Sequence, residues 1–111
     1  IMNLTKEENF YIIEDDRDDI KDFASFIDYK RAHFSNQNLI IDLLKYGTLT
    51  LEELLMFLKS SNDHRGDNKS FVIVNDTINI DTVPDELMVV PTLQEAKDVI
   101  QMEDIERDLG F

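Results

Sequence analysis

Apolar residues along this chain gather into short runs of strand length that alternate with stretches of helical spacing. The runs are rich in β-branched and aromatic residues, which suit a pleated and partly buried surface. They predict strands over residues 1–6, 10–13, 39–41, 71–74 and 88–90. The run at 39–41 continues into Asp42-Leu43-Leu44, so it predicts a strand that is buried on both faces in the middle of the sheet.

Other stretches repeat their apolar residues every three or four positions, as one face of a helix does. Residues 18–33 form the first of these predicted helices. The second begins at Thr50, which has the capping-box spacing to Glu53 and precedes a leucine stripe. The stripe consists of Leu51, Leu54, Leu55 and Leu58. The polar residues 60–68 predict a loop that follows this helix.

The last helix is predicted over residues 93–108. Thr92 and Glu95 have the spacing of a second capping box, and Gly110 is placed to end the helix. Its apolar stripe consists of Leu93, Ala96, Val99 or Ile100, Met102, Ile105 and Leu109. The whole order is strand, strand, helix, strand, helix, strand, strand, helix. It indicates one α/β domain over residues 1–111, with a mixed sheet of four or five strands covered by about three helices.

Composition limits where this domain can act. The chain has 24 Asp and Glu against 11 Lys and Arg, a formal charge of −13, so its field repels nucleic acid and anionic membranes. No stretch reaches the roughly 20 apolar residues that span a bilayer, and the first ten residues are too polar for a signal peptide. There is no cysteine. We therefore expect a cytoplasmic protein that binds neither nucleic acid nor membranes.

The sequence contains no pattern that is typical of an active site. The acidic run at 14–19 lacks the spacing and the glycine of a calcium loop, so it is interpreted as a solvated loop before the first helix. His33 and His64 are interpreted as surface residues, because neither lies in a metal-binding or nucleophile motif. No glycine-rich phosphate loop occurs. The sequence therefore predicts no enzymatic activity, no cofactor and no metal.

Several segments together resemble a known family. Residues 41–43 read Ile-Asp-Leu, and residues 50–54, Thr-Leu-Glu-Glu-Leu, follow after a short connection. Residues 69–74 contain the apolar strand predicted over 71–74, and residues 90–96 join the last predicted strand to the last predicted helix. In order and spacing these segments resemble a STAS domain, the fold of the bacterial anti-sigma-factor antagonists. That family has a buried Ile-Asp-Leu strand and a following Asp-Ser-Ser-Gly-Leu helix start.

This sequence departs from the family pattern in two places. Leu51 and Glu52 replace the serines that a partner kinase phosphorylates in the antagonists. The helix expected between the last two strands is reduced to residues 75–87. The resemblance therefore implies a degenerate member that lacks the serine phosphorylation switch.

The resemblance also implies a regulatory protein-protein interaction module. In the family, the loop at the start of the second helix docks on a partner protein. The corresponding residues here are Gly47, Thr48, Thr50, Leu51, Glu52 and Glu53. The two glutamates can form a fixed acidic surface for a basic partner. Alternatively, they serve the helix alone, by favouring its dipole and capping Thr50.

Two other interpretations remain open from the sequence. Open α/β sheets usually bind ligands at the carboxyl ends of their strands, so a small-ligand or enzymatic role there is the first. The second is a structural homodimer formed through exposed Phe57, Met56 and Met102.

Overall fold

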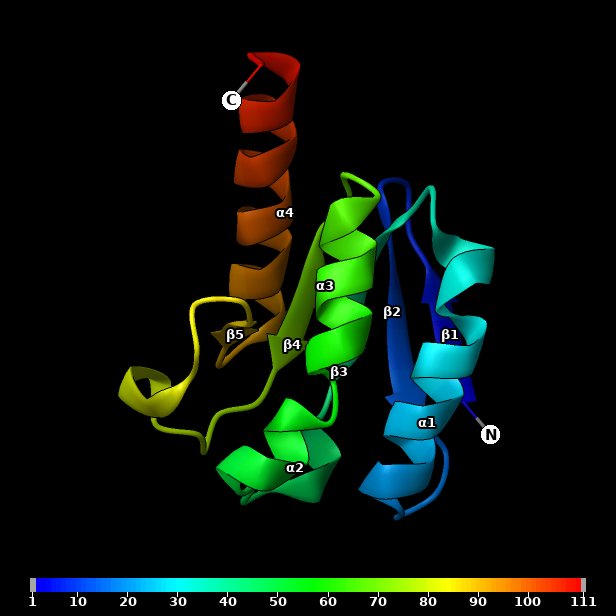
Figure 1. Ribbon diagram of the computed structural model, residues 1–111, viewed down its shortest axis with the longest axis vertical. Helices are drawn as coiled ribbons and strands as arrows, with labels where there is room; N and C mark the ends of the chain where they lie inside the picture. The colour runs from blue at the N-terminus through cyan, green and yellow to red at the C-terminus, as the bar shows by residue number, and fades with distance from the viewer. Residues whose placement is uncertain (1, 111) are drawn as a thin grey trace.

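The predicted α/β order is confirmed by the computed structural model, which describes residues 2–110 (Figure 1). Ile1, which the first predicted strand included, lies outside the described residues. The strands are β1 (Met2–Lys6), β2 (Phe10–Asp15), β3 (Asn38–Asp42), β4 (Phe71–Val74) and β5 (Met88–Val90). The helices are α1 (Ile20–Lys30), α2 (Leu51–Leu55), α3 (Leu58–Gly66) and α4 (Leu93–Asp108).

The five strands lie side by side in sequence order, with β3 in the middle of the sheet. β1 is antiparallel to β2, with Leu4 opposite Ile13, and every other pair is parallel. All five residues of β3 are buried, which confirms the predicted central strand. Because β2, β3, β4 and β5 are parallel, their carboxyl ends form one edge of the sheet, where α1 and α4 begin (Figure 1).

Each face of the sheet carries its own apolar core. On one face, α1, α2 and α3 bury Phe23, Leu54 and Phe57 against Ile41 and Ile73 of the central strands. The other face is covered by α4, which buries a smaller core. That core consists of Ile12, Ile40, Val72, Val74, Ala96 and Ile100. The connection from β4 to β5 contains a short turn of 3₁₀ helix, Ile80–Thr82, in place of a full helix.

The second predicted helix differs from the prediction, because it is divided and extends further along the chain. α2 ends at Leu55, Phe57 leaves helical geometry with φ −95° and ψ 0°, and α3 then continues to Gly66. The predicted loop over 60–68 is therefore wrong for most of its length. Leu54 and Phe57, on either side of this break, are both buried in the core, where Phe57 meets Phe23 edge to face at 6.1 Å between ring centroids.

The inner face of α3 is polar, which is why the sequence pattern predicts a loop there. Ser60, Ser61 and His64 are all buried at the spacing of one helix face. Ser61 Oγ donates to the carbonyl of Glu86 at 3.2 Å, and both ring nitrogens of His64 are hydrogen-bonded. The prediction that His64 lies on the surface is wrong, because these partners compensate its burial. His33 is exposed, as predicted.

α4 has the predicted bounds, and its two ends are capped. Thr92 accepts a hydrogen bond from the backbone of Glu95 at 3.1 Å, and Gly110 follows the helix with φ +83°. Its predicted apolar stripe is divided between two faces, because Ala96 and Ile100 are buried whereas Met102 is 55% exposed. Within residues 2–110, none of the helices has the length and apolar character needed to cross a bilayer.

Candidate functional site

The predicted docking residues lie together at the carboxyl edge of the sheet, where the chain leaves β3 and enters α2 (Figure 1). Gly47 has φ +63° and ψ −121°, a backbone conformation that favours glycine. Thr48 and Thr50 are exposed, whereas Leu49 between them is buried. The segment therefore presents polar residues on the surface and is fixed by one apolar side chain.

The loop after β4 holds this segment in place. Asn75 is 2% exposed, and its Nδ2 donates to the carbonyls of Gly47 at 2.9 Å and Leu43 at 3.3 Å. Thr77 Oγ1 donates to the Gly47 carbonyl at 3.0 Å and lies 3.2 Å from the Leu49 nitrogen, from which it accepts. These bonds join two loops at the carboxyl edge, so the segment is ordered before any partner arrives.

The capping box predicted at the start of α2 is confirmed in both directions. Thr50 Oγ1 accepts from the Glu53 backbone at 3.1 Å, and Glu53 Oε1 accepts from the Thr50 backbone at 3.0 Å. Glu53 therefore has a structural role in capping α2. The prediction treats Glu52 and Glu53 as one acidic surface, but their surroundings differ. Glu52 is exposed.

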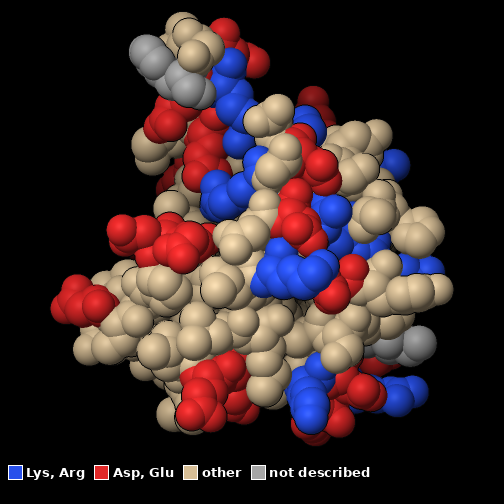
Figure 2. Space-filling model, in the orientation of Figure 1, with Lys and Arg blue, Asp and Glu red and all other residues tan. Residues whose placement is uncertain are grey.

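The outer face of α2 carries exposed apolar side chains beside acidic ones. Leu51 is 36% exposed, Leu55 is 37% exposed and Met56, directly after the helix, is 40% exposed. Of the leucines in the predicted stripe, Leu54 alone is fully buried. Figure 2 shows acidic side chains over α2 at the lower edge of the molecule, and mixed charges over the beginning of α1.

A groove adjoins this face between α1 and α3. It has a volume of about 300 Å³ and is lined by Lys21, Ala24, Ser25, Asp28, Met56 and Lys59. Lys59 Nζ is paired with Asp28 at 3.2 Å and with Asp63 at 3.0 Å. The outer face of α2 therefore continues into a hollow with paired charges on its walls.

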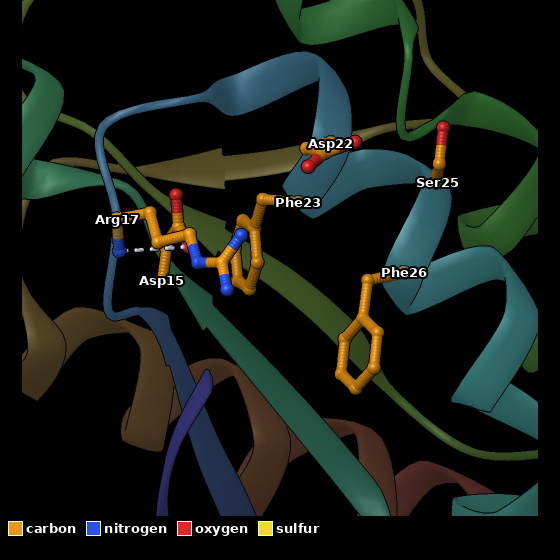
Figure 3. Close-up of a pocket in the computed structure, with 6 residues that line it drawn as sticks. All are labelled: Asp15, Arg17, Asp22, Phe23, Ser25 and Phe26. Atoms are coloured by element: carbon orange, nitrogen blue, oxygen red, sulfur yellow. Dashed lines mark hydrogen bonds between the residues drawn. The ribbon is translucent and has the colours of Figure 1, made fainter. Parts of the chain in front are cut away.

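A second hollow, of about 340 Å³, lies at the carboxyl end of β2, the position predicted for a small-ligand cleft. Asp15 and Arg17 come from β2 and its following loop, and the other lining residues come from α1 (Figure 3). Those residues are Asp22, Phe23, Ser25 and Phe26. The hollow therefore combines charged groups with two phenyl rings.

Hydrogen bonds fix the wall of this second hollow. Asp15 is 5% exposed, and its carboxylate accepts from the Tyr46 hydroxyl and from the Arg17 backbone at 3.1 Å. Burial, followed by the hydrogen bond and negative charge of Asp15, raises the pKa of Tyr46 well above its usual range. Lys45 Nζ donates to the Asp15 carbonyl at 3.1 Å. Both carboxylate oxygens of Asp15 therefore accept hydrogen bonds from within the wall of the hollow.

The prediction of a solvated loop over residues 14–19 is wrong for Glu14 and Asp15, which belong to β2, and Asp15 is buried. The rest of the run is exposed, and Asp19 caps α1 by accepting from the Asp22 backbone at 3.1 Å. Among residues 2–110, no three acidic or histidine side chains converge in a way that could hold a metal ion.

Sequence reasoning missed the interlocking of the two carboxyl-edge loops. Asn75 and Thr77 follow a buried strand, which is the one signal in the sequence that could have placed them beside Gly47. Comparison of the sequence with models of known families gave no match, and neither did comparison with curated proteins. The fold and the geometry are therefore the basis for a functional proposal.

Proposed function

We propose that this chain is a non-enzymatic regulatory module that binds another protein through the α2 face. The α2 face is defined as Gly47, Thr48, Thr50, Leu51, Glu52, Leu55 and Met56. The module acts in the manner of a STAS-domain anti-sigma-factor antagonist without the serine phosphorylation switch. The observation that carries the proposal is the exposure of three large apolar side chains, Leu51, Leu55 and Met56, on and beside one short helix.

The order of the surrounding loops supports this proposal. Binding costs less when the docking segment needs no further ordering. Here Asn75 and Thr77 already fix Gly47, and the capping box fixes the first turn of α2. A partner would therefore meet a preformed surface.

Charge favours a partner with a basic docking surface. The chain carries a net charge of −13, and Glu52 is exposed beside Leu51 and Leu55. Complementary charge mainly raises the association rate and selects among partners, whereas the apolar side chains supply most of the affinity.

The proposal is tested by capturing the tagged protein from an extract of cells that naturally contain it. Leu55→Ser removes the apolar contact, and Glu52→Lys reverses the exposed charge while leaving the Glu53 cap intact. Asp85→Lys is the matched control, because Asp85 is exposed in the connection before β5. We expect one stoichiometric protein that both α2-face variants lose and the control retains. Equal recovery by all four baits would reject the α2 face.

The hollow beside Asp15 and Phe23 favours a second candidate, a small-ligand-binding domain. Its place at the carboxyl end of β2 is where open α/β sheets usually bind ligands. A ligand bound by the folded state alone raises the melting temperature. A panel of amine and carboxylate metabolites should then contain a compound that stabilises the wild type and not the Arg17→Ala variant. No stabilisation by any compound would remove this candidate.

A further inference from the structure

In the second half of α4 the half-buried residues, Glu103, Asp104 and Arg107, are all charged, whereas the large apolar residues Met102 and Ile105 are exposed. A helix on the surface of a globular domain normally has the opposite arrangement. The first half of α4 follows the usual pattern, with Ala96 and Ile100 buried on the sheet. The reversal begins after Ile100, as the helix extends beyond the amino end of the sheet (Figure 1).

Charged side chains attach this half of the helix to the body. Arg65 Nη1 lies 3.1 Å from Glu103, and its Nη2 donates to the Phe71 carbonyl at 3.1 Å. Ser70 Oγ donates to the same Glu103 carboxylate at 2.6 Å. Glu103 therefore fixes α4 to α3 and to the start of β4.

One turn later, Arg107 continues the attachment. Its Nη2 donates to Asp104 at 2.6 Å, to Ser70 Oγ at 3.1 Å and to Asn38 Oδ1 at 3.3 Å. Burial raises the pKa of Asp104, but hydrogen bonds from Asn9, Arg107 and Asn38 outweigh it and hold that pKa below its usual range. The rotation of α4 about its own axis is therefore fixed by these bonds.

This rotation turns an apolar stripe toward solvent. The α4 stripe is defined as Met102, Ile105 and Leu109, which recur at i, i+3 and i+7 and share one helix face. They are 55%, 53% and 66% exposed. The stripe covers about two helical turns, the length that a second helix contacts when it packs alongside.

Acidic residues flank the α4 stripe. Asp98, Glu106 and Asp108 are exposed beside it, whereas the basic Arg107 faces the body. Figure 2 shows acidic side chains along the outer edge of α4. An apolar stripe between acids complements an amphipathic helix whose apolar stripe is flanked by Lys and Arg.

We infer that the α4 stripe is a second docking surface, whose occupant is a basic amphipathic helix of a partner protein. A second copy of this chain fits less well, because pairing two α4 stripes brings the flanking acids of both copies together. Anionic lipid is disfavoured for the same reason. The surface is separate from the α2 face, which lies at the opposite end of the sheet (Figure 1).

The test uses synthetic peptides of about 16 residues, long enough for appreciable helicity when the sequence favours it. The basic probe carries Leu at i, i+3 and i+7 with Lys and Arg on both flanks. One control peptide has Glu on the flanks, and another has the composition of the basic probe in scrambled order. Binding is measured by amide chemical shifts of the full chain during titration. We expect the basic probe to shift residues 98–109 and to bind at least about tenfold more tightly than either control.

Met102→Gln, Ile105→Gln is the matched variant, and Tyr29→Gln, at a 76% exposed position on α1, is its control. We expect the double variant to lose about tenfold or more in affinity for the basic probe while Tyr29→Gln loses none. Equal binding of all three peptides, no binding of the basic probe, or shifts centred on α2 would overturn the inference. If the wild type is a dimer in sedimentation equilibrium and the double variant is a monomer, the α4 stripe would be assigned to a second copy of the chain instead.

Discussion

His64 Nε2 lies 2.6 Å from the backbone carbonyl oxygen of Gln37, in the fully buried face of α3. A carbonyl oxygen can accept but not donate, so Nε2 carries the proton. The Nδ1 atom, 3.2 Å from Arg31 Nη1, then accepts from that guanidinium. The folded protein therefore holds His64 as one neutral tautomer. A second proton would bind at Nδ1, where it would meet the positively charged guanidinium of Arg31.

This arrangement makes the stability depend on pH. Burial, together with the charge of Arg31, outweighs the Gln37 bond and lowers the pKa of His64. Below a pH of about 6.5 the unfolded chain binds a proton that the folded chain does not, so the free energy of unfolding decreases as pH falls. We expect chemical denaturation at pH 7 and pH 5.5 to show this loss. His64→Gln should flatten the dependence, and His33→Gln should not.

Adjacent leucines in α2 provide a test of which side chains face the core. Leu54 is fully buried and Leu55 is 37% exposed, although both belong to the predicted stripe. Leu54→Ala should lower the free energy of unfolding by about 2 to 5 kcal/mol, because it leaves a cavity. Leu55→Ala should change it by less than about 1 kcal/mol. Denaturant titration of both variants measures the difference, and similar losses would contradict this orientation of α2.

Ser60 and Ser61 form a second matched pair. Both are buried in α3, and Ser61 Oγ donates to the Glu86 carbonyl, whereas Ser60 Oγ has no hydrogen-bond partner within residues 2–110. Replacement by alanine changes helix propensity equally at both positions, so the hydrogen bond decides the difference. Ser60→Ala should be more stable than Ser61→Ala by about 1 to 2 kcal/mol in thermal or chemical unfolding. The reverse order would count against the described packing of α3.

Among the polar residues at the carboxyl edge of the sheet, Asn75 should be the one whose substitution lowers stability most. Its side chain donates to Leu43 and Gly47 and accepts from the backbones of Thr77 and Ile78. Asn75→Ala should lower the free energy of unfolding by about 2 to 4 kcal/mol, because several buried groups lose their hydrogen-bond partners together. It should also increase amide hydrogen exchange at residues 47–50. The control is Asn62→Ala, at an exposed position in α3, and an equal effect of the two substitutions would argue against the interlocked loops.

Much of the fold could be predicted because its strands and helix starts have signals in neighbouring residues of the sequence. The apolar runs at 39–41 and 71–74 have no polar face, so they had to lie inside the sheet. Thr50 with Glu53, and Thr92 before Glu95, mark helix starts through bonds made within one turn. Such signals need no knowledge of distant residues.

What the sequence did not reveal depends on contacts between distant residues. His64 is buried because Gln37 and Arg31, 27 and 33 residues away, satisfy its ring. Phe57, proposed for a dimer surface, is fully buried in the core, where its ring packs against Phe23, 34 residues away. Met102 is exposed because Glu103 and Arg107 set the rotation of α4. Periodicity alone could not choose among these faces.

The α2 face is tested most directly by hydrogen exchange on the chain alone and in complex with its captured partner. The proposal predicts that the partner slows exchange at residues 47–56, and that this protection disappears when Leu55→Ser replaces the wild type. Protection confined to residues 15–26, around the hollow beside Asp15, would contradict it and would assign binding to the other site at the carboxyl edge.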